Sequence, residues 1–424
     1  MDPASWKNLT PDQIYHYFME QLVDEKVKIL DQMLDNPSET KIDLLELIDE
    51  SRTELIFLER AAELENLVAR YSKQLPVQYE KQYGFIEQHL INYYLFKGDL
   101  AKVKNRLRIV RKYPLTGVSS VTLRALYQLI YYGHYQEALD YAKDIWRPLR
   151  DSNEIFGLAH AHCCMTIYLD ELEQAWHTIR KGDKPDWEDF IDRMEKYGID
   201  RNVNNFGLII ESLEKPFNRE EVAGMIDRTR KSDLVLFLNI QFLKFMNERF
   251  VVPFMLSDLW WNMIADGKLF RKGKTPGDFF YASYNKLDHR FASHYDHITK
   301  SNDLEMFGRV FGLKYIYYFL AESGLISDKA TSKMKINIDA LEFMFEKMTY
   351  GDLWTMTFVF SWPRLDSVGP DRKDLYESTF SLYEGEYESV FHDYQSRRFN
   401  KFPPGIRKKL VSDLQKGDMD ELPW

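Results

Sequence analysis

The predicted fold depends most on two similar stretches of sequence, 98-GDLAKVKNRL-107 and 133-GHYQEALDYA-142. Each stretch opens with a glycine that suits a turn. Small or apolar residues follow at helical spacing: Val103 and Leu107 in the first stretch, Ala138 and Ala142 in the second. The two glycines lie 35 residues apart, close to the ~34-residue period of tetratricopeptide repeats. We therefore expect antiparallel helix pairs, in which a small residue on the second helix allows close packing.

A third, weaker copy of this pattern begins 37 residues after Gly133, at Asp170-Glu171-Leu172, and continues with Ala175 and Ile179. The early tryptophan and glycine of the repeat consensus are missing, so the match is degenerate. We expect tetratricopeptide-like hairpins over about residues 79–182.

The rest of the chain also has apolar residues at spacings of three and four, and alternating strand patterns are hard to find. Thr10 suits a helix cap, Pro11 the first helical position and Gln13 the partner position of a capping box. We expect one helix from there to Asn36 and a second over residues 41–73. Their apolar stripes are Ile14, Phe18, Leu22 and Val27 in the first helix, and Leu45, Ile48, Leu55, Leu58, Ala62 and Ala69 in the second.

The predicted fold class is therefore all-α, and a joint at Lys181–Pro185 separates two lobes. The N-terminal lobe covers residues 1–182 and carries the tetratricopeptide-like hairpins, and a second all-helical lobe covers residues 183–414. Residues 415–424 form a flexible tail or linker. One hydrophobic core stops growing at about 250–300 residues, so 424 residues need more than one. The second lobe's apolar helices are expected at residues 234–245, 256–265, 310–320 and 338–348.

The composition argues against several classes of protein. A formal net charge of -10 disfavours direct nucleic-acid binding, because an acidic surface repels phosphate. The two cysteines, Cys163 and Cys164, are adjacent and allow no disulfide framework, which suits a reducing cytoplasm. The N-terminus lacks the pattern of a secretory signal, and the most apolar run, residues 234–238, is far shorter than the ~20 residues that span a bilayer. We expect a cytoplasmic protein with no membrane contact.

Two clusters contain side chains that metal ions use. The first consists of His160, His162, Cys163 and Cys164, and the second of Asp288, His289, His294, Asp296 and His297. The first lacks a second Cys/His pair at zinc-finger spacing, so core packing is the favoured interpretation. In the second, His294 and His297 share a helix face, but no further ligand is identifiable, so a solvated face is favoured. We expect neither a metal nor another cofactor.

Catalytic signatures are weak. Gly273-Lys274-Thr275 resembles the end of a phosphate-binding loop, but the upstream glycine and a preceding buried strand are not found. The chain has no Gly-x-Ser-x-Gly nucleophile elbow and no His-Glu-x-x-His helix. We expect that the protein is not an enzyme, and a helical active site of unfamiliar type is the alternative.

The strongest basic run lies on the predicted helix that follows Gly98. The cations on one face of this helix are Lys104, Arg108, Arg111 and Lys112. The apolar residues on the opposite face are Val103, Leu107 and Val110. The plain interpretation is a solvated outer face, and the functional one is a dock for an acidic protein surface or, less often, RNA. These four cations are the candidate partner-binding residues.

An aromatic stripe follows in the second lobe, with residues spaced 4, 3, 4, 4 and 3 apart. Its members are Tyr376, Phe380, Tyr383, Tyr387, Phe391 and Tyr394. Such a stripe is more often a core face than an exposed partner site, although tyrosines would suit an interface.

The order of these features resembles one known class of protein. The relevant parts are the opening MDPASWKNLTPDQIYHYF, the degenerate repeats from Gly98 to Ala175, the aromatic-rich second lobe and the tail KGDMDELPW. Together they resemble the accessory protein of type III-E CRISPR–Cas loci, which is the substrate of the RNA-guided, caspase-like protease called Craspase.

The resemblance implies a role in antiviral defence without enzymatic activity. Target RNA activates the associated protease, which cuts such a protein between a large helical N-terminal part and a smaller C-terminal domain. The large part associates with an extracytoplasmic-function sigma factor, so the intact protein restrains transcription. The implied partners are therefore this sigma factor and the RNA-guided protease complex.

The sequence departs from that pattern because no smaller domain follows Trp424. We expect the chain to be the N-terminal portion, with the cleaved bond near or beyond Trp424. No short motif marks sigma-binding residues, so none is assigned. An unrelated tetratricopeptide-like adaptor or scaffold is the main alternative to this class.

Overall fold

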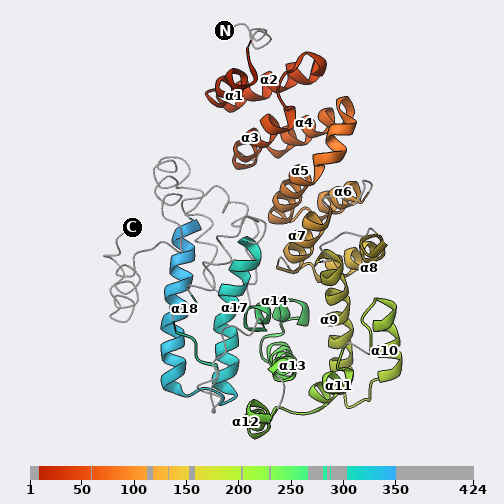
Figure 1. Ribbon diagram of the computed structural model, residues 1–424, viewed down its shortest axis with the longest axis vertical. Helices are drawn as coiled ribbons and strands as arrows, with labels where there is room; N and C mark the ends of the chain where they lie inside the picture. Colours follow the sequence, from red (N-terminus) through yellow and green to blue (C-terminus); the bar gives the residue numbers. More distant parts are fainter. Residues whose placement is uncertain are drawn as a thin grey trace. The chain divides into compact units, whose positions relative to one another are not determined.

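The computed structural model describes residues 9–349, except residues 59, 112–117, 132, 152–157, 202–203, 229–230, 266–279, 284–286 and 288–302. Every regular element in this part of the chain is a helix (Figure 1). The all-α fold class predicted from the sequence is therefore confirmed.

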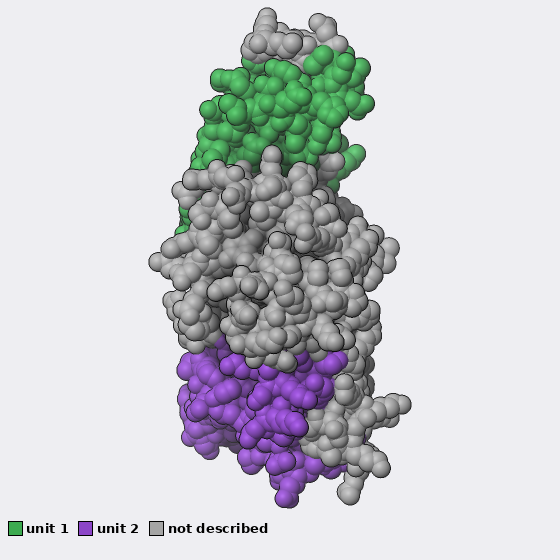
Figure 2. Space-filling model, turned by 90° about the vertical axis from the view of Figure 1, so that its left-hand side faces the viewer, with its two compact units in different colours: residues 1–128, 147–160 green, residues 129–146, 161–424 purple. Residues whose placement is uncertain are grey.

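The chain divides into two compact units, which are coloured separately in Figure 2. The first unit is Met1–Gln128 with Arg147–His160, and the second is Leu129–Trp146 with Ala161–Trp424. The unit boundaries fall inside α7 (Val118–Tyr131), α8 (Tyr135–Asp151) and α9 (Leu158–Arg180). The expected lobes, residues 1–182 and 183–414, and the tail over 415–424 stay predictions.

The remaining helices belong to one unit each. Those of the first unit are α1 (Pro11–Met19), α2 (Val23–Asp35), the 3-10 turn η2 (Pro37–Glu39), α3 (Leu44–Phe57), α4 (Ala61–Gln74), α5 (Pro76–Lys97) and α6 (Leu100–Val110). Those of the second unit are α10 (Trp187–Lys196), α11 (Phe206–Glu214), α12 (Arg219–Arg228), α13 (Lys231–Phe250), α14 (Phe254–Ala265), α17 (Asp303–Glu322) and α18 (Asp328–Thr349). Helices α13, α14, α17 and α18 confirm the four apolar helices predicted for the second lobe.

The first helix begins as predicted but ends early. Thr10 accepts a hydrogen bond from the Gln13 backbone N–H, and the Gln13 side chain accepts one from the Thr10 N–H, which completes the capping box. The expected single helix to Asn36 is wrong, because α1 ends at Met19. The Gln21 side chain donates to the carbonyl of Tyr17 at 2.9 Å and satisfies the end of α1.

The second long helix is also divided. Helix α3 ends at Phe57 and α4 starts at Ala61, and the backbone N–H of Arg60 donates to the carbonyl of Leu55 at 2.7 Å between them. The break changes which residues face the core, so Leu58 is 49% exposed and the expected stripe does not continue. The buried residues of α4 are instead Ala61, Leu64, Leu67, Val68 and Tyr71.

The predicted turns are correct at the two glycines and wrong at the third position. Gly98 separates α5 from α6 with φ +74°, and Gly133 separates α7 from α8 with φ +79°. These left-handed conformations favour glycine. Helix α9 runs without a break through Asp170, and Gly182, with φ +87°, lies just after its end. Repeats of tetratricopeptide type therefore stay a prediction.

Aromatic side chains fill the core of the second unit where α13, α14 and α17 meet. Phe242 packs against Trp261 and against Phe319, with ring centroids 5.3 and 5.7 Å apart. Between the other two helices, the ring of Trp260 on α14 stacks on that of Tyr315 on α17, with ring centroids 4.9 Å apart. Side chains of this size give α14 and α17 a large shared contact surface.

His89 lies buried on α5 in the first unit, near the guanidinium groups of Arg52 and Arg124. Burial, and then the charges of these two arginines, lowers the pKa of His89 well below its usual value. Below about pH 6.5 the unfolded chain binds a proton here and the folded chain does not. The free energy of unfolding therefore falls as the pH drops, by up to about 1.4 kcal/mol per pH unit from this group.

We expect His89→Gln to reduce this acid sensitivity. Between about pH 6.5 and pH 5, the variant's free energy of unfolding should fall less steeply than that of the natural chain. Urea denaturation at several pH values, followed by circular dichroism, measures both slopes. Equal slopes would contradict the assignment of a neutral, buried His89.

Candidate functional site

The predicted basic face lies on α6. Asp99 caps this helix by accepting a hydrogen bond from the Lys102 backbone N–H at 3.1 Å. Its apolar side, formed by Val103, Leu107 and Val110, is buried as expected. The candidate residues Lys104, Arg108 and Arg111 are exposed, and Lys112 lies outside the described residues. Three of the four candidate cations are therefore exposed to solvent.

Two other cations of the same basic run, the largely buried Arg106 and the half-exposed Lys102, form ion pairs with acidic residues of α4 and α5. Arg106 donates to Glu65 of α4 at 2.5 Å and to Glu87 of α5 at 3.3 Å, and Tyr79 donates to Glu87 at 2.8 Å. Lys102 also donates to Glu65, at 3.2 Å. The Glu87 side chain is fully buried, and burial raises its pKa while the charge of Arg106 opposes that shift. This network links α6 to α4 and α5 and so fixes the helix that carries the exposed cations.

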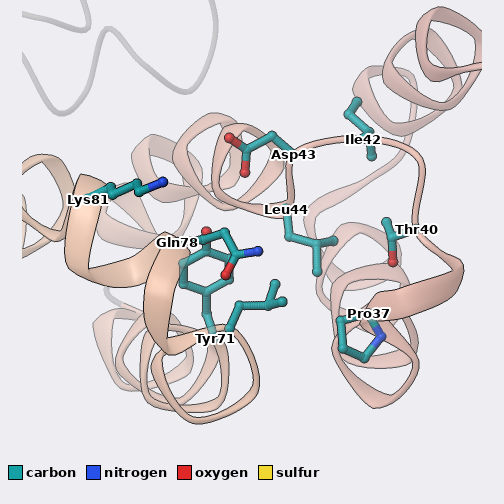
Figure 3. A pocket seen from close by; sticks show the side chains of 9 residues that line it. Pro37, Thr40, Ile42, Asp43, Leu44, Tyr71, Gln78 and Lys81 are labelled. Atoms are coloured by element: carbon teal, nitrogen blue, oxygen red, sulfur yellow. The ribbon is translucent and has the colours of Figure 1, made fainter.

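A pocket of about 250 Å³ lies elsewhere in the first unit (Figure 3). It is bounded by the connection from η2 to α3, the end of α4 and the start of α5, which bring together Asp43, Tyr71 and Lys81. Tyr71 is fully buried, and its hydroxyl has no hydrogen-bond partner among the described residues. Burial, and then the charge of Asp43, raises the pKa of Tyr71 to about 12. The tyrosine is therefore a neutral hydroxyl at ordinary pH.

The first predicted metal cluster lies on α9, and both of its cysteines are part of the core. Cys163 and Cys164 are buried, and Cys164 Sγ donates to the carbonyl of Tyr197 at 3.0 Å. Burial raises the pKa of both thiols, which disfavours the thiolate that a metal needs. Burial likewise lowers the pKa of His160. Core packing is the better account of the two cysteines, and no group of three metal-ligating side chains gathers among the described residues.

Several predicted features lie outside the described residues. They are the cluster Asp288, His289, His294, Asp296 and His297, the loop Gly273-Lys274-Thr275, the aromatic stripe from Tyr376 to Tyr394, and the tail that ends at Trp424. The interpretations given to them from the sequence stay predictions. Within the described part of the chain, no helix combines the length and the apolarity that crossing a bilayer requires.

The sequence pattern also missed a buried cation in the second unit. Lys244 of α13 donates to the carbonyls of Ser212, Leu213 and Lys215 at 3.2, 3.0 and 2.6 Å, at the C-terminal end of α11. Its Nζ also lies 4.7 Å from the ring centroid of Trp176. Burial lowers the pKa of Lys244 to about 8. The contacts give Lys244 a structural role, since a cation at a helix C-terminus stabilises its unpaired carbonyls.

A scan against protein-family models, a search of curated proteins and a search of solved structures find no match to this chain.

Proposed function

We propose that this chain is a cytoplasmic, non-enzymatic regulator of type III-E CRISPR antiviral defence that acts by binding other proteins. In this proposal it restrains an extracytoplasmic-function sigma factor and is cut by the RNA-activated protease. The order of sequence features supports the class of protein. The observation that carries the binding role is the exposed row of Lys104, Arg108 and Arg111 on α6.

The chemistry of this row suits an acidic protein surface. The whole chain has a net charge of -10, so a local group of cations gives a contrast in potential that steers an acidic partner. The ion pairs of Arg106 with Glu65 and Glu87 hold α6 in place. A helix that is already fixed loses less conformational entropy when a partner binds. A set of packed helices also offers a broad face to a helical partner.

Charge reversal of this row tests the proposal. We expect Lys104→Glu/Arg108→Glu/Arg111→Glu to weaken binding of the sigma factor by at least about tenfold, because attraction is replaced by repulsion. We also expect the affinity of the natural chain, but not that of the variant, to fall as salt rises. Isothermal titration calorimetry at two salt concentrations measures both effects.

A matched variant controls for the change in net charge. Lys181→Glu/Lys184→Glu/Lys329→Glu makes the same change in charge at exposed positions of the second unit. This control should keep most of the affinity. Equal affinity of the α6 variant and the natural chain would reject α6 as the binding face.

A further inference from the structure

The pocket of the first unit is lined by a buried polar group that has no hydrogen-bond partner in the part of the chain that the structure describes. Tyr71 is fully buried and lines the pocket, and its hydroxyl has no hydrogen-bond partner among the described residues. Figure 3 shows its ring beside Gln78 at the centre of the lining residues. A buried hydroxyl without a partner costs about 1–3 kcal/mol, so a ligand that supplies one gains binding energy.

The charged side chains of the pocket come from separate elements. Asp43 stands at the N-terminus of α3, where its carboxylate accepts a hydrogen bond from the Leu45 backbone N–H at 2.9 Å. After burial, the negative charge of Asp43 is the second cause that raises the pKa of Tyr71, and the carboxylate makes this side of the pocket favourable for a cationic group. Lys81 of α5 is exposed and supplies a positive charge to the lining.

The rest of the pocket is small and mixed in character, since Thr40 and Gln78 add polar side chains to its lining. Leu44, Leu75 and Ile42 contribute aliphatic walls. A volume of about 250 Å³ lies below the range of roughly 300–1,000 Å³ that is typical for drug-sized ligands. The occupant is therefore a small molecule with an aliphatic body and charged groups of opposite sign.

We propose that this pocket binds a free amino acid with a branched aliphatic side chain. Its ammonium group lies toward Asp43 and the Tyr71 hydroxyl, its carboxylate toward Lys81, and its side chain against Leu44 and Leu75. The site is independent of the cations on α6, so each proposal can fail without the other.

Three probes test the chemistry on the full chain. L-Leucine carries both charges, 3-methylbutylamine lacks the carboxylate, and 4-methylpentanoate lacks the ammonium group. We expect saturable binding of L-leucine in ligand-observed NMR, and an upward shift of Tm that grows with its concentration. Each analogue should bind at least about tenfold more weakly. No saturable binding of L-leucine up to ~10 mM, or equal binding of all three, overturns the proposal.

Two substitutions test whether L-leucine binds in this pocket. We expect Tyr71→Phe to weaken L-leucine binding by about fivefold and Lys81→Met by about tenfold. Without ligand, Tyr71→Phe should keep the natural Tm or raise it, because it removes an unpaired buried hydroxyl. Lys73→Met changes an exposed lysine outside the pocket lining and should bind like the natural chain. Unchanged affinity in both pocket variants rejects this site.

Discussion

Arg106→Met is expected to lower the free energy of unfolding by about 3–5 kcal/mol, because it removes one partner of a buried ion pair. The Glu87 side chain has no exposed surface, and the substitution leaves its carboxylate without the cation that opposes the effect of burial. Glu65 loses its shortest ion pair at the same time. Urea denaturation followed by far-UV circular dichroism measures the loss.

A neighbouring lysine provides the control for this prediction. Lys102 pairs with the same Glu65 from one helical turn away, but its side chain is 44% exposed. Lys102→Met should therefore cost less than about 1 kcal/mol. The double variant Arg106→Met/Glu87→Gln should recover part of the stability lost by Arg106→Met alone. A loss below about 1 kcal/mol for Arg106→Met would contradict the role of the network.

Gly312→Ala is the second substitution with a large expected effect. A Cβ atom at position 312 of α17 would lie 2.4 Å from Cβ and Cγ of Trp260 on α14. Trp260 has little room to move away, since it is buried and its ring stacks on Tyr315. We expect the methyl group to lower the free energy of unfolding by about 1–3 kcal/mol, measured by thermal and urea denaturation.

A substitution at a second helical glycine distinguishes the effect of steric overlap on stability from the effect of helix propensity. Gly224 of α12 has nothing within 4 Å of an added Cβ. Gly224→Ala should therefore stabilise the protein by up to about 1 kcal/mol, because alanine is the better helix former. A stabilising effect of Gly312→Ala, like that expected for Gly224→Ala, would contradict the close contact between Gly312 of α17 and Trp260 of α14.

Local patterns in the sequence predicted much of the fold. The capping box at Thr10 and Gln13 involves residues three apart, and the turns at Gly98 and Gly133 require a left-handed conformation that glycine favours. The break before Ala61 was not predicted, because the apolar spacing continues through it and only the contacts of α4 show that the buried face has changed. Asp170 suggested a turn by analogy with the two glycines, but nothing there prevents a helix.

The contacts at the candidate sites could not be predicted from periodicity, because they join residues far apart in the chain. Helical spacing separates Lys104, Arg108 and Arg111 from Arg106, but only the positions of Glu65 and Glu87 determine which set is inside. The pocket depends on Tyr71 meeting residues from α3 and α5, and its signal is an unpaired hydroxyl that a sequence does not show.

Binding of the sigma factor by the purified chain tests the central claim most directly. Size-exclusion chromatography with light scattering, on an equimolar mixture with the extracytoplasmic-function sigma factor of the same organism, gives the mass of any complex. The proposal predicts one peak, whose mass is the 50.5 kDa of this chain plus that of the sigma factor. Two separate peaks, each with the mass of one protein, at concentrations of about 10 µM or more would contradict it.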